Sequence, residues 1–325
     1  MNKIFITGAG GYVGAMLVRE LLDKEYFVTA YDLFTYGDVF NNHKNLKIVK
    51  GDIRNQEMLK KNILGHNILI HLACISNDPS FELNPNLGKE INYDAFEPMV
   101  RIAKDSGVER FIYASSSSVY GLKDEDNVTE EATLEPLTDY SKFKAMCEDI
   151  LIKYNDDNFT GTIIRPATVC GYSIRQRFDL VVNILTNNAF NKGKIIVFGG
   201  NQLRPNIHIK DMVNAYFKVI EADKKIVSGQ IFNAGFENRT VSELANKVKN
   251  IIGKNIEIIY EKTDDNRSYH VSSDKIYKVL SYKPNFTIDD AIKDLFEGFK
   301  NNIFTDPLNN ENYFNIKKMQ NTKLK

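Results

Sequence analysis

Residues 4–14 read Ile4-Phe5-Ile6-Thr7-Gly8-Ala9-Gly10-Gly11-Tyr12-Val13-Gly14, a short apolar run followed by a cluster of glycines. The apolar run predicts a strand, and the pattern from Val13 to Lys24 predicts an amphipathic helix directly after it. Such glycines allow a tight turn and a close approach of the backbone to a ligand, while the helix N-terminus offers free amides to an anion. A merely flexible turn is the alternative, but the flanking strand and helix favour a dinucleotide site. The contacts expected from this segment are Gly8, Gly11, Tyr12, Val13 and Gly14.

The rest of the first half alternates β-branched or aromatic runs with helical segments, which predicts a parallel sheet covered by helices on both faces. About six parallel strands are expected, at residues 4–6, 27–31, 46–49, 68–72, 111–114 and 162–164. The fold class is therefore α/β, a doubly wound parallel sheet of the Rossmann type. Pro98 interrupts the helical segment 87–104, so we expect a kink or a late helix start there.

After Arg165 the pattern becomes less regular and predicts a smaller, mixed α/β C-terminal lobe that covers the substrate. Strands are expected at 195–198, 230–233 and 256–260, and helices at 211–222, 241–252, 273–280 and 288–301. Ser273 and Thr287 stand where the last two helices begin, and Ser273 is a plausible cap. The expected division is a nucleotide-binding domain at 1–166 with a return segment near 206–236, a substrate lobe at 167–205 and 237–305, and a frayed tail at 306–325.

Composition excludes several classes of protein. Apolar residues make up 43% and charged residues 26% of the 325 residues, as in an ordinary globular protein. The 42 basic residues balance the 42 acidic ones, so no overall field draws the chain to nucleic acid or to an anionic membrane. Cys74, Cys147 and Cys170 have neither a metal nor a redox spacing and are expected as free thiols. With neither a signal peptide nor a membrane span expected, and no metal, a cytoplasmic location fits best.

Asp32 closes the second predicted strand, where a carboxylate can accept hydrogen bonds from the ribose hydroxyls of a dinucleotide. Residues 33–36 contain no Arg or Lys to neutralise a ribose phosphate, so the cofactor is expected to be NAD rather than NADP. A solvated acid at a strand end is the alternative. Asp52 and Ile53 follow the third strand and are expected near the adenine, although Gly-Asp pairs are also common in turns.

Tyr140 and Lys144 stand one helical turn apart, so both side chains can point into the same cleft. A nearby ammonium and the positive nicotinamide ring favour a phenolate, which can remove a hydroxyl proton. This spacing also arises by chance, but here a strand at 111–114 runs into the serines 115–118 at the carboxyl edge, where doubly wound sheets bind their ligands.

Taken together, these motifs resemble the extended short-chain dehydrogenase/reductases, the NAD-dependent sugar-nucleotide epimerase and dehydratase family. The resemblance spans roughly residues 3–300 and rests on the glycine run, Asp32, His71-Leu72-Ala73, Val119-Tyr120-Gly121 after the serines, Tyr140 with Lys144, and Arg165-Pro166. It implies that Tyr140 is the base, that Ser116 hydrogen-bonds the reacting oxygen, and that Lys144 holds the tyrosine and the nicotinamide ribose. It also implies cofactor contacts at Leu72 and Ala73.

The same resemblance disfavours dehydration. The 4,6-dehydratases of the family carry an Asp and a Glu directly after the position of Ser116, because elimination of water needs an acid and a base. This chain has Ser117 and Ser118 there, and hydroxyl groups do not readily replace carboxyl groups near neutral pH. Simple oxidation remains, with Ser117 expected beside the substrate.

On the substrate side, residues 199–211 resemble the family segment whose arginine binds the substrate diphosphate, and Arg204 is the matching position. Arg267 resembles a second arginine that closes over the same phosphates, and Ser76 and Asn183 are expected to reach the substrate. Arginines in loops are usually solvated, which is the alternative for both. His208 lies between two isoleucines and is expected to be a packed, hydrogen-bonded histidine rather than a base.

Residues 76–80, residues 168–173 with Arg175 and Arg177, and Cys170 in place of a more usual tyrosine distinguish the chain from common UDP-glucose epimerases. They look most like GDP-heptose C4-dehydrogenases of capsular-heptose biosynthesis. This resemblance implies oxidation of a GDP-sugar, GDP-D-glycero-D-manno-heptose, at its C4 hydroxyl, with NAD as cofactor. A 4-epimerase is the nearest alternative and a noncatalytic NAD-binding scaffold a remote one. Relatives pair through helices that flank the tyrosine, so a homo-oligomer is expected.

Overall fold

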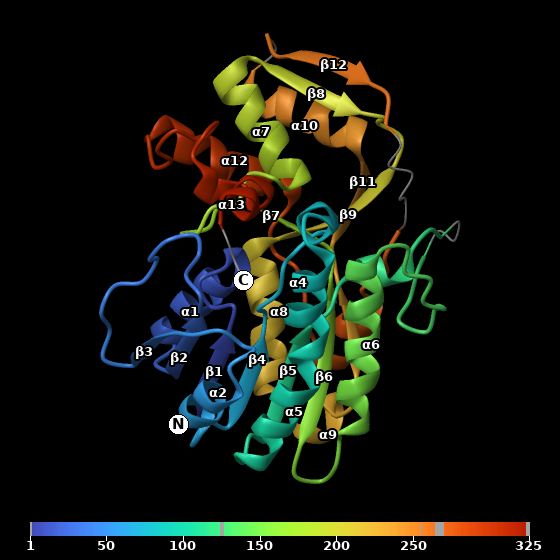
Figure 1. Cartoon of the computed structure of the whole chain (residues 1–325). Coiled ribbons are helices and arrows are strands. Elements are labelled where there is room, and N and C mark those ends of the chain that lie inside the picture. Colours follow the sequence, from blue (N-terminus) through green and yellow to red (C-terminus); the bar gives the residue numbers. More distant parts are fainter. Residues whose placement is uncertain (1, 124–126, 254, 264–269, 323–325) are drawn as a thin grey trace.

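The computed structural model describes residues 2–123, 127–253, 255–263 and 270–322, and its centre is a parallel sheet (Figure 1). The strand order is β10-β6-β5-β4-β1-β2-β3, and every neighbouring pair is parallel. The strands are β1 (Lys3–Thr7), β2 (Phe27–Asp32), β3 (Leu46–Lys50), β4 (Ile68–His71), β5 (Arg110–Ala114), β6 (Thr160–Pro166) and β10 (Ile231–Ala234). This architecture confirms the doubly wound α/β fold, and the order reverses between β1 and β4, which is where such sheets bind ligands.

The alternation of side chains along the strands explains why both faces of the sheet are covered. Ile4 and Ile6 of β1 belong to the apolar cluster under α1 (Tyr12–Asp23) and α8 (Ile209–Glu221), whereas Phe5 points to the opposite cluster. The helices over that second face are α2 (Gln56–Ile63), α5 (Phe96–Asp105) and α6 (Asp139–Lys153). Two separate apolar clusters therefore hold a three-layer core together.

The sheet has one strand more than the sequence predicted, because β10 pairs with β6 at the edge. A strand was expected at 230–233, but a run of four residues does not reveal which sheet it joins. β10 follows α8 and the short α9 (Lys224–Val227). The Pro98 prediction is confirmed: α4 (Pro85–Lys89) continues as a π-helical turn, Glu90–Asp94, and α5 starts at Phe96 with the proline in its first turn.

The smaller lobe lies beyond the carboxyl ends of the main strands (Figure 1). Its small sheets are β11-β9-β7, from β7 (Thr168–Cys170), β9 (Leu203–His208) and β11 (Glu237–Thr240), and β12-β8, from β8 (Lys194–Phe198) and β12 (Glu257–Glu261). The helices α7 (Val181–Lys192), α10 (Val241–Ile252) and α12 (Ile288–Lys300) pack together with these strands around a third apolar cluster. Thr287 opens α12 through a capping box with Asp290.

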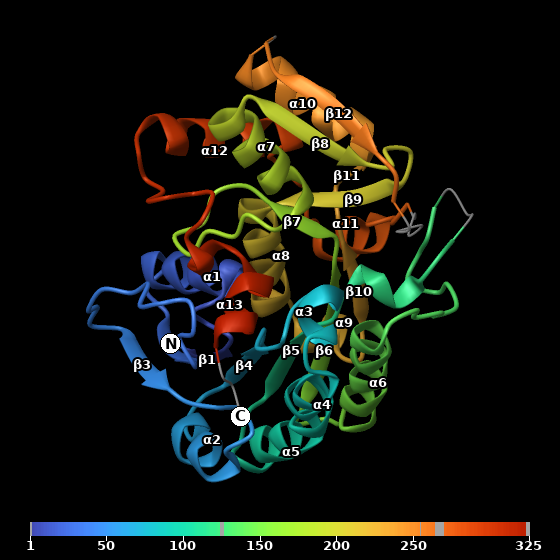
Figure 2. The same ribbon diagram turned by 45° about the horizontal axis from the view of Figure 1, so that its top comes forward.

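Two local predictions are wrong. Ser273 precedes α11 (Asp274–Leu280), but its hydroxyl accepts the amide of Gly235 at 2.8 Å and does not cap the helix. Residues 306–321 are not a frayed tail: the chain forms a 3₁₀ turn at Glu311–Tyr313 and then α13 (Asn315–Asn321). Figure 2 shows α13 between the two lobes, beside α3 (Asp78–Glu82).

The three cysteines are unpaired, as expected from their spacing. Within the described ranges, no helix is both long and apolar enough to cross a membrane.

Candidate active site

A cavity of about 740 Å³ lies at the carboxyl edge of the main sheet and is lined by residues of both lobes. One end is lined by the glycine turn and by Asp32, and its middle by the serines 115–118 and Tyr140. The far end is lined by residues of the smaller lobe, among them Phe198 and Arg204. The cavity therefore joins most of the residues that the sequence analysis selected.

The glycine turn is sterically required. A Cβ atom on Gly14 would lie 2.2 Å from the Gly8 carbonyl oxygen, and one on Gly8 would lie 2.4 Å from the Ala73 amide nitrogen. Gly8 also has a φ of 74°, in the left-handed region. Leu72 and Ala73, which follow β4, and Tyr12 and Val13 all line the cavity together with this turn. The backbone here forms a cradle that leaves room for a dinucleotide.

Asp32 is held at the end of β2 by two backbone amides. Its Oδ2 accepts the Gly10 amide at 3.0 Å, and its Oδ1 accepts the Phe34 amide at 2.6 Å. Burial raises the pKa of Asp32, which these hydrogen bonds and the charge of Arg175 oppose. The carboxylate lies in the cavity wall, the position from which the resemblance expects it to bind the ribose hydroxyls of the cofactor.

Asp52 and Ile53 also lie in the cavity wall, but the Asp52 carboxylate is already paired. Its Oδ2 lies 2.7 Å from Nη2 of Arg54. Burial raises the pKa of Asp52, but the hydrogen bonds and the charge of Arg54 outweigh it and hold the value below normal. Ile53, which is 6% exposed, provides an apolar wall. The predicted adenine contact of Asp52 stays a prediction.

Tyr140 enters the cavity from the first turn of α6, which a capping box between Thr138 and Ser141 begins. Ser116, two residues after the end of β5, lines the same cavity and acts to lower the pKa of the Tyr140 phenol. Lys144 lies one turn further along α6, with its ammonium 5.9 Å from the centre of the Tyr140 ring. That ammonium donates to the Ala114 carbonyl at 2.7 Å. The fold thus brings the predicted phenol, hydroxyl and amine together.

Burial is the largest influence on the pKa of Tyr140. Burial raises the pKa of Tyr140 well above its ordinary value, and the charges of Cys74 and Asp78 act in the same direction. Arg177 and Ser116 oppose this shift. Lys144 is held by the Ala114 carbonyl and does not line the cavity.

The segment 115–118 after β5 consists of four serines and contains no acidic residue. Ser116 and Ser118 share a hydrogen bond of 2.8 Å between their hydroxyl groups, and Ser117 is 3% exposed in the cavity wall. The carboxylate that acts on Tyr140 is Asp78, which accepts a hydrogen bond from the Thr138 hydroxyl. Asp78 had not been predicted as a site residue. Its position just after a buried strand, at the carboxyl edge, was the available signal.

The residues predicted on the substrate side do not all lie in the cavity wall. Arg204 lines the far end of the cavity with Gln202 and Phe198, and Ser76 lines its middle. Arg267 lies outside the described residues. Asn183 is fully buried and does not line the cavity.

Asn183 instead organises the loop that precedes α7. Its amide nitrogen donates to the Tyr12 hydroxyl at 3.0 Å and to the Arg177 carbonyl at 2.8 Å. Its oxygen accepts the Gly171 amide at 3.0 Å. These bonds satisfy the side chain, so Asn183 links the smaller lobe to the glycine turn rather than to the cavity.

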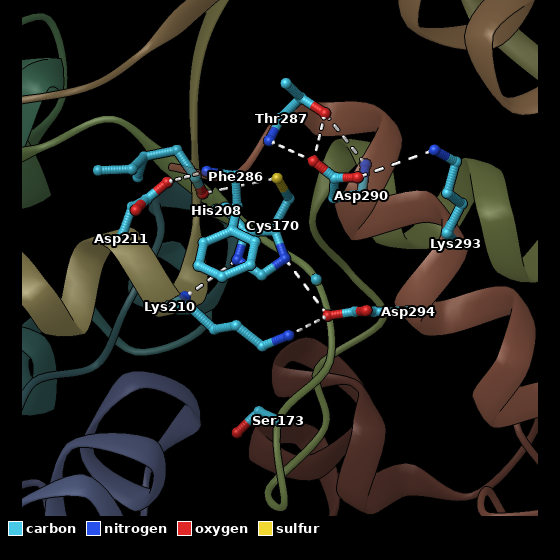
Figure 3. A network of polar contacts seen from close by, with 12 residues as sticks. Cys170, Ser173, His208, Lys210, Asp211, Phe286, Thr287, Asp290, Lys293 and Asp294 are labelled. Atoms are coloured by element: carbon cyan, nitrogen blue, oxygen red, sulfur yellow. Dashed lines mark hydrogen bonds and ion pairs between the residues drawn. The ribbon is translucent and has the colours of Figure 1, made fainter. Parts of the chain in front are cut away.

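Figure 3 shows His208 as the centre of a packed polar cluster away from the cavity. Its Nδ1 accepts the Lys210 amide at 3.1 Å, and its ring stacks on Phe286 at 4.9 Å. Its Nε2 lies 3.5 Å from Oδ2 of Asp294, which also pairs with the Lys210 ammonium. The prediction of a packed, hydrogen-bonded histidine is confirmed, and the cluster joins α8 to α12.

Residues 4–235, more than half of the chain, match the family model described as the NAD dependent epimerase/dehydratase family. The chain belongs to this family. Relatives include a putative UDP-glucose 4-epimerase of Methanocaldococcus jannaschii, 27% identical over 92% of this chain and 99% of its own. Another is a dTDP-glucose 4,6-dehydratase of Streptomyces niveus, 22% identical over 92% of this chain and 93% of its own.

Solved structures of this family have the same fold. A UDP-glucose 4-epimerase of Thermotoga maritima, solved with UDP-glucose, superposes with a TM-score of 0.84 and 23% identity over 93% of this chain and all of its own. A dTDP-glucose 4,6-dehydratase of Streptomyces venezuelae, solved with NAD, has a TM-score of 0.85 and 23% identity over 94% and 99% of the two chains. The protein is an NAD-dependent enzyme of the sugar-nucleotide epimerase and dehydratase group. The glycine cradle and Asp32 described above fit NAD.

Further cavity residues of this family member were not predicted as site residues. Arg175, Arg177 and Asp179 line the cavity from the loop before α7, and Asn315 and Met319 line it from α13. The two arginines were noted in the sequence only as distinguishing residues. Nothing in the sequence pattern indicated that the C-terminal segment returns to the cavity.

Proposed function

We propose that the protein oxidises the C4 hydroxyl of a nucleotide-diphosphate sugar to a 4-keto sugar nucleotide. The observation that carries this proposal is the position of the Tyr140 phenol and of Ser116 in the wall of the cavity that also contains the glycine cradle. The lining of the cavity supports it, because the glycine turn of the main domain and Arg204 of the smaller lobe both belong to it and can serve a dinucleotide and a second nucleotide.

In the proposed mechanism the hydroxyl oxygen on C4 loses its proton and the C4 carbon loses a hydride. Bound NAD supplies the acceptor for the hydride. Tyr140 removes the proton of the C4 hydroxyl, and Ser116 hydrogen-bonds the same oxygen as it becomes a carbonyl. Lys144, anchored on Ala114, places a positive charge beneath the Tyr140 ring, and Arg177 adds another that stabilises the phenolate. The enzyme contributes orientation and electrostatics.

Dehydration is not part of the proposal. Ser117 and Ser118 stand where the resemblance places an acid and a base in the 4,6-dehydratases, and neither hydroxyl titrates near neutral pH. Incubation with dTDP-glucose should therefore give no 6-deoxy product by mass spectrometry. Formation of a product lighter by one water would contradict this part of the proposal.

For the substrate we propose a GDP-sugar, GDP-D-glycero-D-manno-heptose, on the resemblance of residues 76–80 and 168–173. The product would leave as the keto sugar with reduced cofactor. A 4-epimerase is the second candidate, because the relatives include UDP-glucose 4-epimerases that match nearly the whole chain. Both candidates share the first oxidation step.

A panel of GDP- and UDP-sugars separates the candidates. Equal amounts of keto product and reduced NAD support the dehydrogenase, whereas an epimer without net change in cofactor supports the epimerase. If no sugar turns over and Tyr140→Phe changes nothing, the protein is a scaffold instead. We also propose a homo-oligomer, and a monomeric mass in light scattering would contradict it.

A further inference from the structure

Two buried arginines on the loop before α7 form part of the cavity wall. Arg175 is 4% exposed and Arg177 is 8% exposed, and both line the cavity. Arginine side chains are rarely buried this far unless their charge is paired, so the pair calls for a partner.

The protein supplies too little negative charge for them. The Arg177 Nε pairs with Asp179 at 2.5 Å and its Nη1 donates to Ser76, but its Nη2 is buried without a hydrogen-bond partner. Arg175 donates from Nη2 to the neutral amide of Asn315 at 2.8 Å, and its Nε is buried without a partner. Among the described residues no carboxylate forms an ion pair with Arg175, and burial lowers its pKa to about 10. An anion from outside the chain would complete the pair.

The arginines stand between the two halves of the predicted dinucleotide site. The Arg175 guanidinium lies 3.5 Å above the centre of the Tyr36 ring, close to Asp32 at the adenosine end. Arg177 contacts Ser76, which follows β4, and its charge reaches Tyr140 at the nicotinamide end. A dinucleotide that spans these ends has its diphosphate between them.

The glycine turn faces the same loop. The Ser173 hydroxyl donates to the Tyr12 carbonyl at 2.8 Å, and the Tyr12 hydroxyl donates to the Gly171 carbonyl at 2.6 Å. The loop is thus tied to the start of α1, whose amides are available to one side of a diphosphate. The arginines provide charge on the other side.

Asn315 of α13 fixes this arrangement from the C-terminal segment. Its side-chain oxygen accepts from Arg175, and its side-chain nitrogen donates to Ser76 at 2.9 Å. Its backbone amide donates to Asp179 at 2.7 Å. Asn315 therefore binds Arg175 directly and also binds Ser76 and Asp179, the two partners of Arg177. These contacts keep both guanidinium groups in the cavity wall.

We propose that Arg175 and Arg177 bind the diphosphate of NAD opposite the glycine turn, and that Asn315 positions Arg175 for this contact. The substrate also carries a diphosphate, but Arg204 already lies at the other end of the cavity. The proposal concerns the cofactor alone, so a substrate panel that fails while NAD binds would overturn the proposed reaction and leave this inference standing.

Calorimetric titrations of the full-length protein with NAD, ADP-ribose, adenosine and GDP test the proposal. Arg175→Gln should weaken NAD and ADP-ribose roughly 10- to 100-fold, the usual range for a hydrogen bond to a charged group, and leave adenosine unchanged. Asn315→Ala should weaken the same two ligands by a smaller factor. Arg239→Gln, at a partly exposed arginine that does not line the cavity, is the matched control and should change nothing.

The same titrations define the contrary results. An equal loss of affinity for adenosine would mean that the adenosine end has been distorted. A loss of affinity confined to GDP would assign the arginines to the substrate. Either result overturns the proposal, and so does an unchanged affinity for all four ligands. Thermal unfolding shows whether each variant is folded. If Arg175→Gln does not fold, Arg175→Lys retains the charge without the planar fork, and it should still weaken ADP-ribose more than adenosine.

Discussion

The Glu148 carboxylate lies 2.6 Å from Nη2 of Arg165, and both side chains are only 3% exposed. Glu148 stands two turns after Tyr140 on α6, on the same face as Lys144. It also accepts a hydrogen bond from Ser115, which directly precedes Ser116. This ion pair therefore anchors the helix that carries the phenol to the strands that carry its partners.

Removal of one partner should destabilise the fold strongly, because it leaves a buried charge unpaired. Glu148→Gln is expected to lower the free energy of unfolding by about 3–5 kcal/mol, measured by urea denaturation. Glu297→Gln removes an exposed partner of Lys300 and should change it by less than about 1 kcal/mol. Similar losses in both variants would mean that the buried pair has no special role.

Tyr140→Phe should reduce kcat by roughly 10²- to 10⁴-fold, the usual contribution of a positioned acid or base. The ring and its packing on Phe81 are retained, so the affinity for NAD should change little. Tyr93→Phe, which alters a tyrosine that stacks on Phe143 outside the cavity, is the control. A kcat that Tyr140→Phe leaves unchanged, measured on a turned-over sugar, would remove Tyr140 from the mechanism.

Asp78→Asn should shift the pH profile of kcat/KM toward lower pH. The negative charge of Asp78 helps to raise the pKa of Tyr140, so the neutral amide lowers the pH at which the base becomes available. Asp139→Asn is the control: this side chain is 59% exposed on α6, the helix of Tyr140, and its loss should leave the pH profile unchanged. A shift toward higher pH after Asp78→Asn would show that the sign of this coupling is wrong.

Asp32→Asn should lower the affinity for NAD by about tenfold and reduce the preference for NAD over NADP. The amide is a poorer acceptor for ribose hydroxyls, and it no longer repels a ribose phosphate. Fluorescence titrations with the two cofactors measure both effects, with the exposed Asp38→Asn as control. An unchanged NAD/NADP ratio would exclude Asp32 as the selective residue.

The stability of the protein should fall above about pH 10, where buried tyrosines lose protons less readily than in the unfolded chain. Burial raises the pKa of Tyr31 from 10.0 to about 12, so its contribution is complete below pH 10 and is lost as the pH rises through 12. Tyr31→Phe removes a hydrogen bond to the Asp52 carbonyl and should cost about 1 kcal/mol at pH 7.

The difference between wild type and Tyr31→Phe should then shrink as the pH rises from 9 to about 12 in chemical denaturation. Tyr260→Phe, at a tyrosine that is 55% exposed, should follow the wild-type curve. A constant difference would mean that Tyr31 does not titrate with unfolding.

Local sequence patterns were sufficient for the elements whose physical cause is local. Gly8 and Gly14 are demanded because a Cβ atom on either would lie under 3 Å from the backbone of Ala73 or Gly8, and Thr287 begins α12 through a residue three positions away. Tyr140 and Lys144 share a helix face because they are one turn apart. The alternation of β-branched or aromatic runs with helical segments predicted the parallel sheet.

What the sequence by itself determined is therefore the fold class, the steric need for the glycine turn and the shared helix face of Tyr140 and Lys144. Only the tertiary structure decided that β10 joins the main sheet. It also decided that Asn183 hydrogen-bonds the loop at Gly171, and that Asn315 hydrogen-bonds Ser76, 239 residues away in the chain. Periodicity and spacing describe interactions within one helix or strand. Contacts between distant segments depend on how whole layers pack, and no short pattern encodes them.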